Sequence, residues 1–248
     1  MSFSDSHCHL DSYTPERLLE VIGQAEAKQV DIMLSVGMSL ESSEEVISLA
    51  RSHERILAAV GIHPWNAVSP DEDVRRRLAA LARREGVVAI SEIGLDYARN
   101  PGTREVQKEL LRYELSLALE TGLPVNIHCR EAHEDMMAII RNEIGSGLKG
   151  NVHGFSGDRT ALKDWLDLGF YVSVGRSLLR DDVESLPDAV RAISLDRLLT
   201  ETDASGRGTG SPVDVIVVAE KLASIRGETA EQLGTAATDN LKRLLSIK

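Results

Sequence analysis

The stretch "EVQKELLRYELSLALETGLPVNIHCR", residues 105–130, contains one complete helix and strand of a repeating pattern. Residues 105–122 have the apolar spacing of an amphipathic helix, and Gly122 stands where a glycine commonly ends one. The short apolar run at 124–128 then predicts a buried strand. His128 and Arg130 come at the end of this strand, so the unit places two side chains of functional types directly after a structural element.

The same alternation of helix and strand extends over the whole chain. Apolar or β-branched runs predict seven further strands, at residues 3–8, 30–36, 56–61, 87–93, 150–153, 170–174 and 198–202. Amphipathic helices are expected between them, at residues 16–28, 42–53, 71–86, 131–145 and 211–227. The pattern is weakest at residues 177–194, because Pro187 interrupts the helical spacing there.

Eight strands that alternate with helices over 248 residues predict an α/β fold, a TIM-type (β/α)8 barrel. A doubly wound open sheet is the alternative arrangement for such units. No linker, low-complexity segment or shift in composition marks a domain boundary, so residues 1–248 are expected to form a single domain.

The composition excludes several classes of protein. An apolar share of 42% and a charged share of 27% are typical of soluble globular proteins. No apolar run approaches the ~20 residues of a membrane span, and no secretory signal is evident, which favours the cytoplasm. Two cysteines, Cys8 and Cys129, do not indicate a disulfide framework. The net charge of −11 argues against a broad basic surface for nucleic acid.

Histidines and carboxylates gather at the ends of the predicted strands. Five of the seven histidines have this placement, together with four acidic residues: His7, His9, His63, His128, His153, Glu92, Asp96, Glu201 and Asp203. In a barrel, the loops at the carboxyl ends of the strands converge and form the active site. Imidazole and carboxylate groups suit zinc, manganese or related divalent ions. The pattern therefore predicts a metal centre at this rim.

One ion is expected next to the first strand. Residues i and i+2 of a strand point to the same side, so His7 and His9 can bind one ion together. Asp203 follows the last strand, which closes the barrel beside the first, and can complete the ligands of this ion. Glu201 is expected to point to the opposite side from Asp203 and is therefore not assigned to the site.

A second ion is expected beside the first. His128 and His153 follow neighbouring strands, as shared ligands of a second ion would require. Glu92 directly follows a buried apolar run, where an acidic residue is costly without a cation, and its two oxygens can bridge two ions. Two divalent ions, whether zinc, manganese or magnesium, can activate a water molecule for hydrolysis.

The segments "DSHCHLD", "GIHPW", "EIGLDY", "IHCREA", "HGFSG" and "ETDA" occur in this order from residue 5 onward, followed by the tail "DNLKRLLSI". Together they resemble the TatD-like metal-dependent hydrolases of the amidohydrolase superfamily. The resemblance implies a TIM-type barrel, a divalent-metal site and hydrolysis, with deoxyribonuclease activity as the usual attribution. It also implies the two ligand groups given above, with Glu92 between them, and places His63 near the substrate.

One segment departs from that family. After the final aspartate, family members often have a small residue followed by Pro-Tyr and Leu, whereas Asp203 is followed by "ASGRGTGSP". Gly206 and Gly208 would let the backbone approach a ligand closely, and Arg207 could bind a phosphate or carboxylate. A flexible surface turn is the structural alternative.

The residues and their chemistry favour a metal-dependent hydrolase, most simply a deoxyribonuclease that cleaves phosphodiester bonds. Asp203 is expected to accept the proton of the attacking water, with Glu92 as its catalytic partner between the ions. His63 and Arg130 are candidates to hold anionic oxygens of the substrate, although Arg130 could instead neutralise nearby carboxylates.

The expected substrates are single-stranded DNA, DNA strand ends or a small anionic molecule. With 4% aromatic residues the chain offers few surfaces for base stacking, which argues against tight binding along a duplex. Two alternatives stay open: an amidohydrolase that acts on an ester or amide of a small metabolite, and a catalytically silent partner protein with the same barrel.

Overall fold

The computed structural model describes the chain except for residues 1, 100, 146, 181, 182, 209 and 248. The described residues form one parallel sheet in the order β8-β7-β6-β5-β4-β3-β2-β1-β9. Its strands are β1 (Phe3–His9), β2 (Val30–Val36), β3 (Ile56–Val60), β4 (Val87–Asp96), β5 (Val125–Arg130), β6 (Gly150–Val152), β7 (Tyr171–Val174), β8 (Leu198–Thr200) and β9 (Ala204–Ser205). All eight predicted strands occur, and β9 is an addition that follows β8 closely.

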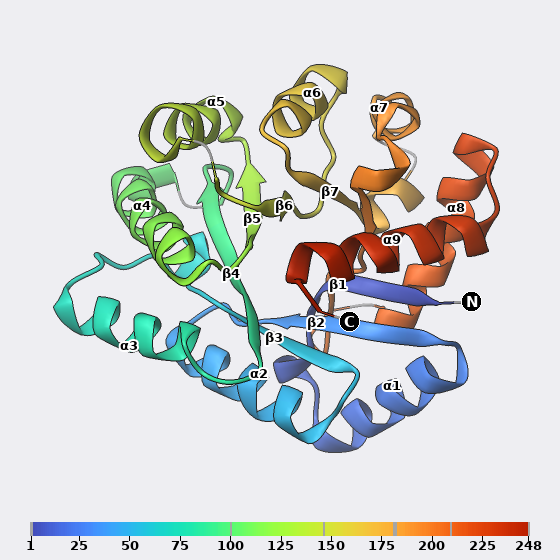
Figure 1. Ribbon diagram of the computed structural model, residues 1–248, viewed down its shortest axis with the longest axis horizontal. Coiled ribbons are helices and arrows are strands. Elements are labelled where there is room, and N and C mark those ends of the chain that lie inside the picture. Colours follow the sequence, from blue (N-terminus) through green and yellow to red (C-terminus); the bar gives the residue numbers. More distant parts are fainter. Residues whose placement is uncertain (1, 100, 146, 181–182, 209, 248) are drawn as a thin grey trace.

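Helices connect these strands and lie outside them (Figure 1). They are α1 (Pro15–Ala27), α2 (Leu40–Ser52), α3 (Glu72–Ala82), α4 (Arg104–Thr121), α5 (His133–Ala138), α6 (Arg159–Asp167), α7 (Leu186–Ala192), α8 (Val215–Arg226) and α9 (Ala230–Leu245). Helices α6 and α9 were not among the predicted helices. Pro187 lies in the first turn of α7, where its missing N–H costs nothing, so it starts this helix rather than interrupting one.

The sheet curls into a barrel with its seam between β8 and β1. The Thr200 hydroxyl donates to the carbonyl oxygen of Ser4 at 3.0 Å, and the Thr202 N–H donates to Asp5 Oδ1 at 3.0 Å. The Asp203 N–H then donates to the carbonyl oxygen of His7 at 2.9 Å. Because the strands follow one another in chain order and the seam is joined, the TIM-type barrel is confirmed and the open doubly wound sheet is wrong.

The barrel interior changes from apolar to polar along the strands. Ile32 of β2 and Leu199 of β8 are buried in one hydrophobic cluster with Leu241 of α9. Further along, the hydroxyls of Ser6 and Ser173 lie 2.7 Å apart across the interior. The polar interior therefore lies directly beneath the strand ends that carry the histidines.

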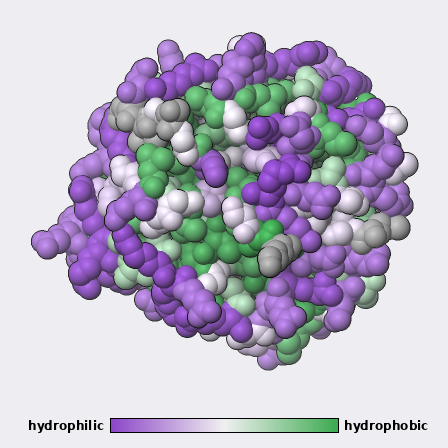
Figure 2. Space-filling model, viewed as in Figure 1, coloured by the Kyte–Doolittle hydropathy of each residue, from purple (hydrophilic) through white to green (hydrophobic). Residues whose placement is uncertain are grey.

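The surface of the molecule carries both hydrophobic and hydrophilic residues. Hydrophobic residues gather towards the centre of the face shown in Figure 2, and hydrophilic residues cover most of its margin. The hydrophilic margin is what amphipathic helices produce when they turn their apolar sides towards the sheet and their polar sides outward. None of the helices in the described part of the chain has the length and apolar character to cross a bilayer.

Gly94 of β4 is required by the close approach of β5. Its φ is +149°, and a Cβ at this position would lie 1.9 Å from the carbonyl oxygen of His128. Backbone cannot move aside as a flexible side chain can, so Gly94→Ala is expected to lower the free energy of unfolding by about 3 kcal/mol or more. Urea denaturation measures this change.

A matched control for this prediction is Gly23→Ala in α1. A Cβ at Gly23 would meet nothing within 4 Å, so the substitution should raise stability by about 0.5–1 kcal/mol through helix propensity. A Gly94→Ala protein as stable as the wild type would contradict the strand pairing described here.

Candidate metal centre

Glu92 of β4 is the buried carboxylate around which the histidines gather, with 3% of its surface exposed. Its Oε2 lies 3.4 Å from His7 Nε2 and 3.7 Å from His9 Nε2. Its Oε1 lies 2.8 Å from His128 Nδ1 and 2.8 Å from His153 Nε2. The two oxygens thus face separate pairs of histidines, which is the arrangement of a carboxylate shared between two ions.

The first ligand group consists of His7 and His9 of β1 and of Asp203, which follows β8. Asp203 Oδ1 lies 3.2 Å from His9 Nε2 and 3.8 Å from His7 Nε2. His7 Nε2 is buried and has no hydrogen-bond partner among the described residues. A buried polar atom without a partner is costly, and a divalent ion held by these three residues would satisfy it.

The ring of His7 is oriented by Asn126 of β5. His7 Nδ1 lies 3.0 Å from Asn126 Oδ1, and the Asn126 amide donates to the carbonyl oxygen of Ser6 at 3.2 Å. The second bond fixes which end of the amide faces His7, so His7 Nδ1 carries the proton and donates it. His7 Nε2 is then the unprotonated atom that faces the carboxylates, as a metal ligand must be.

The ring of His128 is oriented by Asp96, at the end of β4. Asp96 Oδ2 lies 3.0 Å from His128 Nε2 and accepts a bond from Trp65 Nε1 at 2.7 Å, while its Oδ1 accepts from the Arg99 N–H at 2.9 Å. Burial alone would raise the pKa of Asp96, but the bonds from His128, Arg99 and Trp65 lower it well below its usual value. Asp96 therefore leaves His128 Nδ1 facing Glu92.

His153 is oriented by Glu201, and here the sequence-based expectation was wrong. Glu201 Oε1 accepts from the Gly154 N–H at 2.7 Å and lies 3.3 Å from His153 Nδ1. Strand β8 ends at Thr200, so the alternation of sides no longer applies to the residues that follow it. Burial lowers the pKa of His153, but the charges of Glu92 and Glu201 raise it well above its usual value.

His63, after β3, is held as a hydrogen-bond donor. Its Nδ1 accepts from the Trp65 N–H at 2.9 Å, so a neutral ring carries its proton on Nε2, which lies 3.2 Å from Glu92 Oε1. Burial lowers the pKa of His63 and favours this neutral ring. Its distance from Glu92 and His128 would allow it to share an ion, but a protonated Nε2 donates instead of ligating.

The spacing of the donor atoms fits divalent ions. Among the described residues, three groups have ligand atoms within 4.8 Å of one another: His7–His9–Asp203, His7–Glu92–His153 and His63–Glu92–His128. Metal bonds of about 2.1 Å place neighbouring ligand atoms about 3.0–3.5 Å apart, close to the distances given above. Neither cysteine contributes a thiolate: Cys8 is buried in the core, and burial raises the pKa of Cys129 to about 12.

Arg130, at the end of β5, lies beside this group. It is exposed and lines a cavity of about 700 Å³ together with His128, His153 and Asp203. The Asp203 side chain is 58% exposed, so the carboxylate forms the solvent side of the metal centre. The cavity therefore gives a substrate access to the ligands and to one predicted substrate-binding residue.

Arg207 is exposed on the loop after β9 and is not among the residues that line this cavity. Burial raises the pKa of Asp11, and the charge of Arg207 acts against that rise. The Gly206 N–H donates to Ser12 Oγ at 2.8 Å, and a Cβ at Gly206 would lie 2.3 Å from the Ser12 carbonyl oxygen. The glycine therefore lets the loop approach its own chain; Thr209, in the same loop, lies outside the described residues.

Asp96→Asn tests the orientation of His128. The amide would present N–H groups to the donors that now bond to Asp96 Oδ2, so the affinity for the divalent ion should fall by about 10- to 100-fold. Competition with a coloured chelator measures the affinity. Asp239→Asn, an exposed substitution in α9, should leave it unchanged. Equal affinities in the two variants would remove Asp96 from the metal centre.

A family model described as "TatD related DNase" matches residues 4–246. The chain belongs to the TatD family. It is 37% identical to the "Uncharacterized metal-dependent hydrolase YcfH" of Escherichia coli (strain K12), over 100% of this chain and 97% of that protein. It is 32% identical to the "3'-5' ssDNA/RNA exonuclease TatD" of Enterobacter lignolyticus, over 92% of each chain.

A solved structure agrees with the TatD assignment. The crystal structure of the TatD homologue YJJV from Escherichia coli K12 superposes with a TM-score of 0.89 at 28% identity, and the match covers 99% of this chain and 98% of that one. The barrel, the ligand cluster and the family membership together make this TatD-family protein a metal-dependent hydrolase.

Proposed function

We propose that this TatD-family hydrolase is a deoxyribonuclease that cleaves phosphodiester bonds in single-stranded DNA or at DNA strand ends. The observation that carries the proposal is the position of Glu92, whose two oxygens face separate histidine pairs beside an open cavity. Two divalent ions bound there would polarise a phosphoryl oxygen and lower the pKa of a water molecule.

Asp203 is the group placed to move the proton. Desolvation raises its pKa, but the bond from His9 and the charges of His7 and His153 lower it to about 2. Asp203 is therefore a carboxylate at neutral pH, and its exposed position lets it reach an attacking water. It accepts the proton of that water and returns it to the leaving oxygen.

Two other side chains are placed to hold the phosphate. His63 presents the Nε2–H that now faces Glu92, and a phosphate oxygen is an equally good acceptor for it. Arg130 brings a guanidinium to the rim of the cavity, where it can bind a second oxygen. Both groups would stabilise the negative charge that grows on the phosphorus oxygens in the transition state.

The charge of the chain favours strand ends over long duplexes. A net charge of −11 repels DNA along most of the surface, whereas two dications outweigh Glu92 and Asp203 locally. The name of the Enterobacter lignolyticus relative, a 3'-5' ssDNA/RNA exonuclease, supports the same class of substrate. We therefore expect short or frayed single strands to be degraded faster than intact duplexes.

Nuclease assays with linear single-stranded, duplex and circular single-stranded DNA test this proposal in Mg²⁺, Mn²⁺ and Zn²⁺. Linear single strands should be shortened from an end, while the circle should resist. A parallel panel of carboxylic esters and amides tests the amidohydrolase alternative. Hydrolysis confined to that panel, with no DNA degraded in any metal, would contradict the proposed function.

A further inference from the structure

A second charged group of residues lines the cavity beside the metal centre. The segment after β7 contributes Arg176, Ser177 and Arg180 to the lining, and Arg130 at the end of β5 lines the same cavity. These residues come from a segment whose helical pattern is broken in the sequence, so their position could not be expected from periodicity. Arg176 and Arg180 also interact with other groups of the protein, which limits their freedom.

The loop that contains Gly210 leaves room for the Arg176 side chain. Gly210 has a φ of +109°, and a Cβ there would lie 2.3 Å from Arg176 Nη1. The absence of a side chain at Gly210 therefore leaves the space that this guanidinium occupies. The same hypothetical Cβ would lie 3.0 Å from Asp214 Oδ2, so this carboxylate lies near the Arg176 guanidinium.

Ser177 gives an independent sign of a ligand. Its hydroxyl oxygen is buried and has no hydrogen-bond partner among the described residues, although the residue lines the cavity. A hydroxyl beside arginines is a common combination for binding phosphate oxygens. A volume of about 700 Å³ lies within the usual range for a small-molecule site, about 300–1,000 Å³, and exceeds what one phosphate needs.

We propose that this cavity is a second anion subsite, in which Arg176 and Arg180 bind the phosphate next to the scissile one. The proposal rests on the proposed function and narrows its substrate to nucleotide chains with at least two phosphates. The scissile phosphate lies at the histidines and the neighbouring phosphate lies among the arginines. The metal centre and the subsite share one cavity, so one substrate can reach both.

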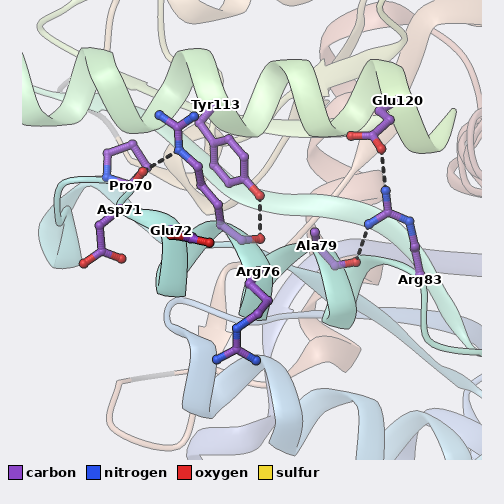
Figure 3. A pocket seen from close by; sticks show the side chains of 9 residues that line it. Pro70, Asp71, Glu72, Arg76, Ala79, Arg83, Tyr113 and Glu120 are labelled. Atoms are coloured by element: carbon purple, nitrogen blue, oxygen red, sulfur yellow. Dashed lines mark hydrogen bonds and ion pairs between the residues drawn. The ribbon is translucent and has the colours of Figure 1, made fainter.

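A second hollow that contains arginines differs from the cavity beside the metal centre. A groove of about 670 Å³ between α3 and α4 also contains arginines (Figure 3). There Arg83 donates to Glu120 Oε1 at 2.6 Å and to the Ala79 carbonyl oxygen at 2.9 Å, as the dashed lines show. None of the metal ligands lines this groove, and its Arg83 is already paired with Glu120, so the cavity beside the metal centre is the better place for a substrate phosphate.

Equilibrium binding tests the subsite without turnover. Thymidine 3',5'-bisphosphate and the two thymidine monophosphates contain no phosphodiester bond, so calorimetry with the manganese-loaded protein reports affinity alone. The bisphosphate should bind about 10- to 100-fold more tightly than either monophosphate, because one added phosphate gains charge-assisted hydrogen bonds. Equal affinities would overturn the proposal without any variant.

Substitutions then show which residues cause the tighter binding of the bisphosphate. Arg176→Gln and Arg180→Gln should each reduce the advantage of the bisphosphate at least threefold. Arg83→Gln, in the groove of Figure 3, should retain it. An advantage that persists in a protein with Arg176 and Arg180 both changed to Gln would place the second phosphate elsewhere and overturn the proposal.

The two proposals fail in different ways. A protein that degrades DNA but binds the bisphosphate no better than the monophosphates keeps the proposed function and loses the subsite. A protein that prefers the bisphosphate but degrades no DNA keeps the subsite and loses the nuclease proposal. Faster cleavage of pTpT than of TpT would identify a nucleotide chain, rather than a small bisphosphate, as the source of the second anion.

Discussion

Replacement of Glu92 by glutamine is expected to lower kcat for phosphodiester hydrolysis by about 10³-fold or more. The amide has one oxygen and one NH₂ group, so it can face only one histidine pair as an acceptor. It also removes the negative charge that two neighbouring dications require. The number of tightly bound ions per chain should fall in parallel, and elemental analysis after dialysis measures it.

A matched control separates this effect from a general loss of acidic charge. Glu44 is exposed on α2 and does not belong to the ligand cluster. Glu44→Gln should therefore leave both kcat and metal content unchanged. A Glu92→Gln protein that retains kcat within tenfold of the wild type and the full metal content would exclude Glu92 as the bridge.

Asp203→Asn is expected to lower kcat by about 10²–10⁴-fold at saturating metal, because the amide cannot accept a proton from water. Its oxygen can still face His9, so the fold and part of the metal affinity should persist. Single-turnover assays over a range of Mn²⁺ concentrations separate the loss of chemistry from the loss of metal. If excess metal restored the wild-type rate, Asp203 would be a ligand only and another group would move the proton.

The strands could be predicted because buried parallel strands are short apolar runs, and these are distinct from amphipathic helices. Their order in the barrel followed from the regular alternation of units. Pro187 was misread because proline breaks a helix only in its interior, and the sequence alone did not show where α7 begins.

The ligand cluster could be predicted because parallel strands all end at one rim. His7, His9, Glu92 and His128 lie in the second halves of their strands, His153 and Asp203 follow β6 and β8, and the structure brings these six together. Asn126 was missed although it had a usable signal: it is polar, lies within a buried strand and stands two residues before His128. Residues at that spacing share a side of the strand.

Residues beyond the strand ends could not be placed in the same way. Glu201 follows the end of β8, so strand alternation gave the wrong side for it. Arg207 was a candidate to bind substrate because it lies in the glycine-rich segment after Asp203. The direction of a side chain in a loop depends on tertiary contacts, and these cannot be read from a regular spacing of residues in the sequence. Arg176 and Arg180 lie in a similar segment after β7, and only the folded chain shows that they share a cavity with Arg130.

The central claim is that Glu92 lies between two divalent ions. A crystal of the manganese-loaded protein, measured at a wavelength with strong anomalous scattering from manganese, tests it most directly. We predict two anomalous peaks about 3.5–4 Å apart, one beside His7, His9 and Asp203 and one beside His128 and His153. Density without a peak at Glu92, or a peak bound only by residues outside this cluster, would contradict the account.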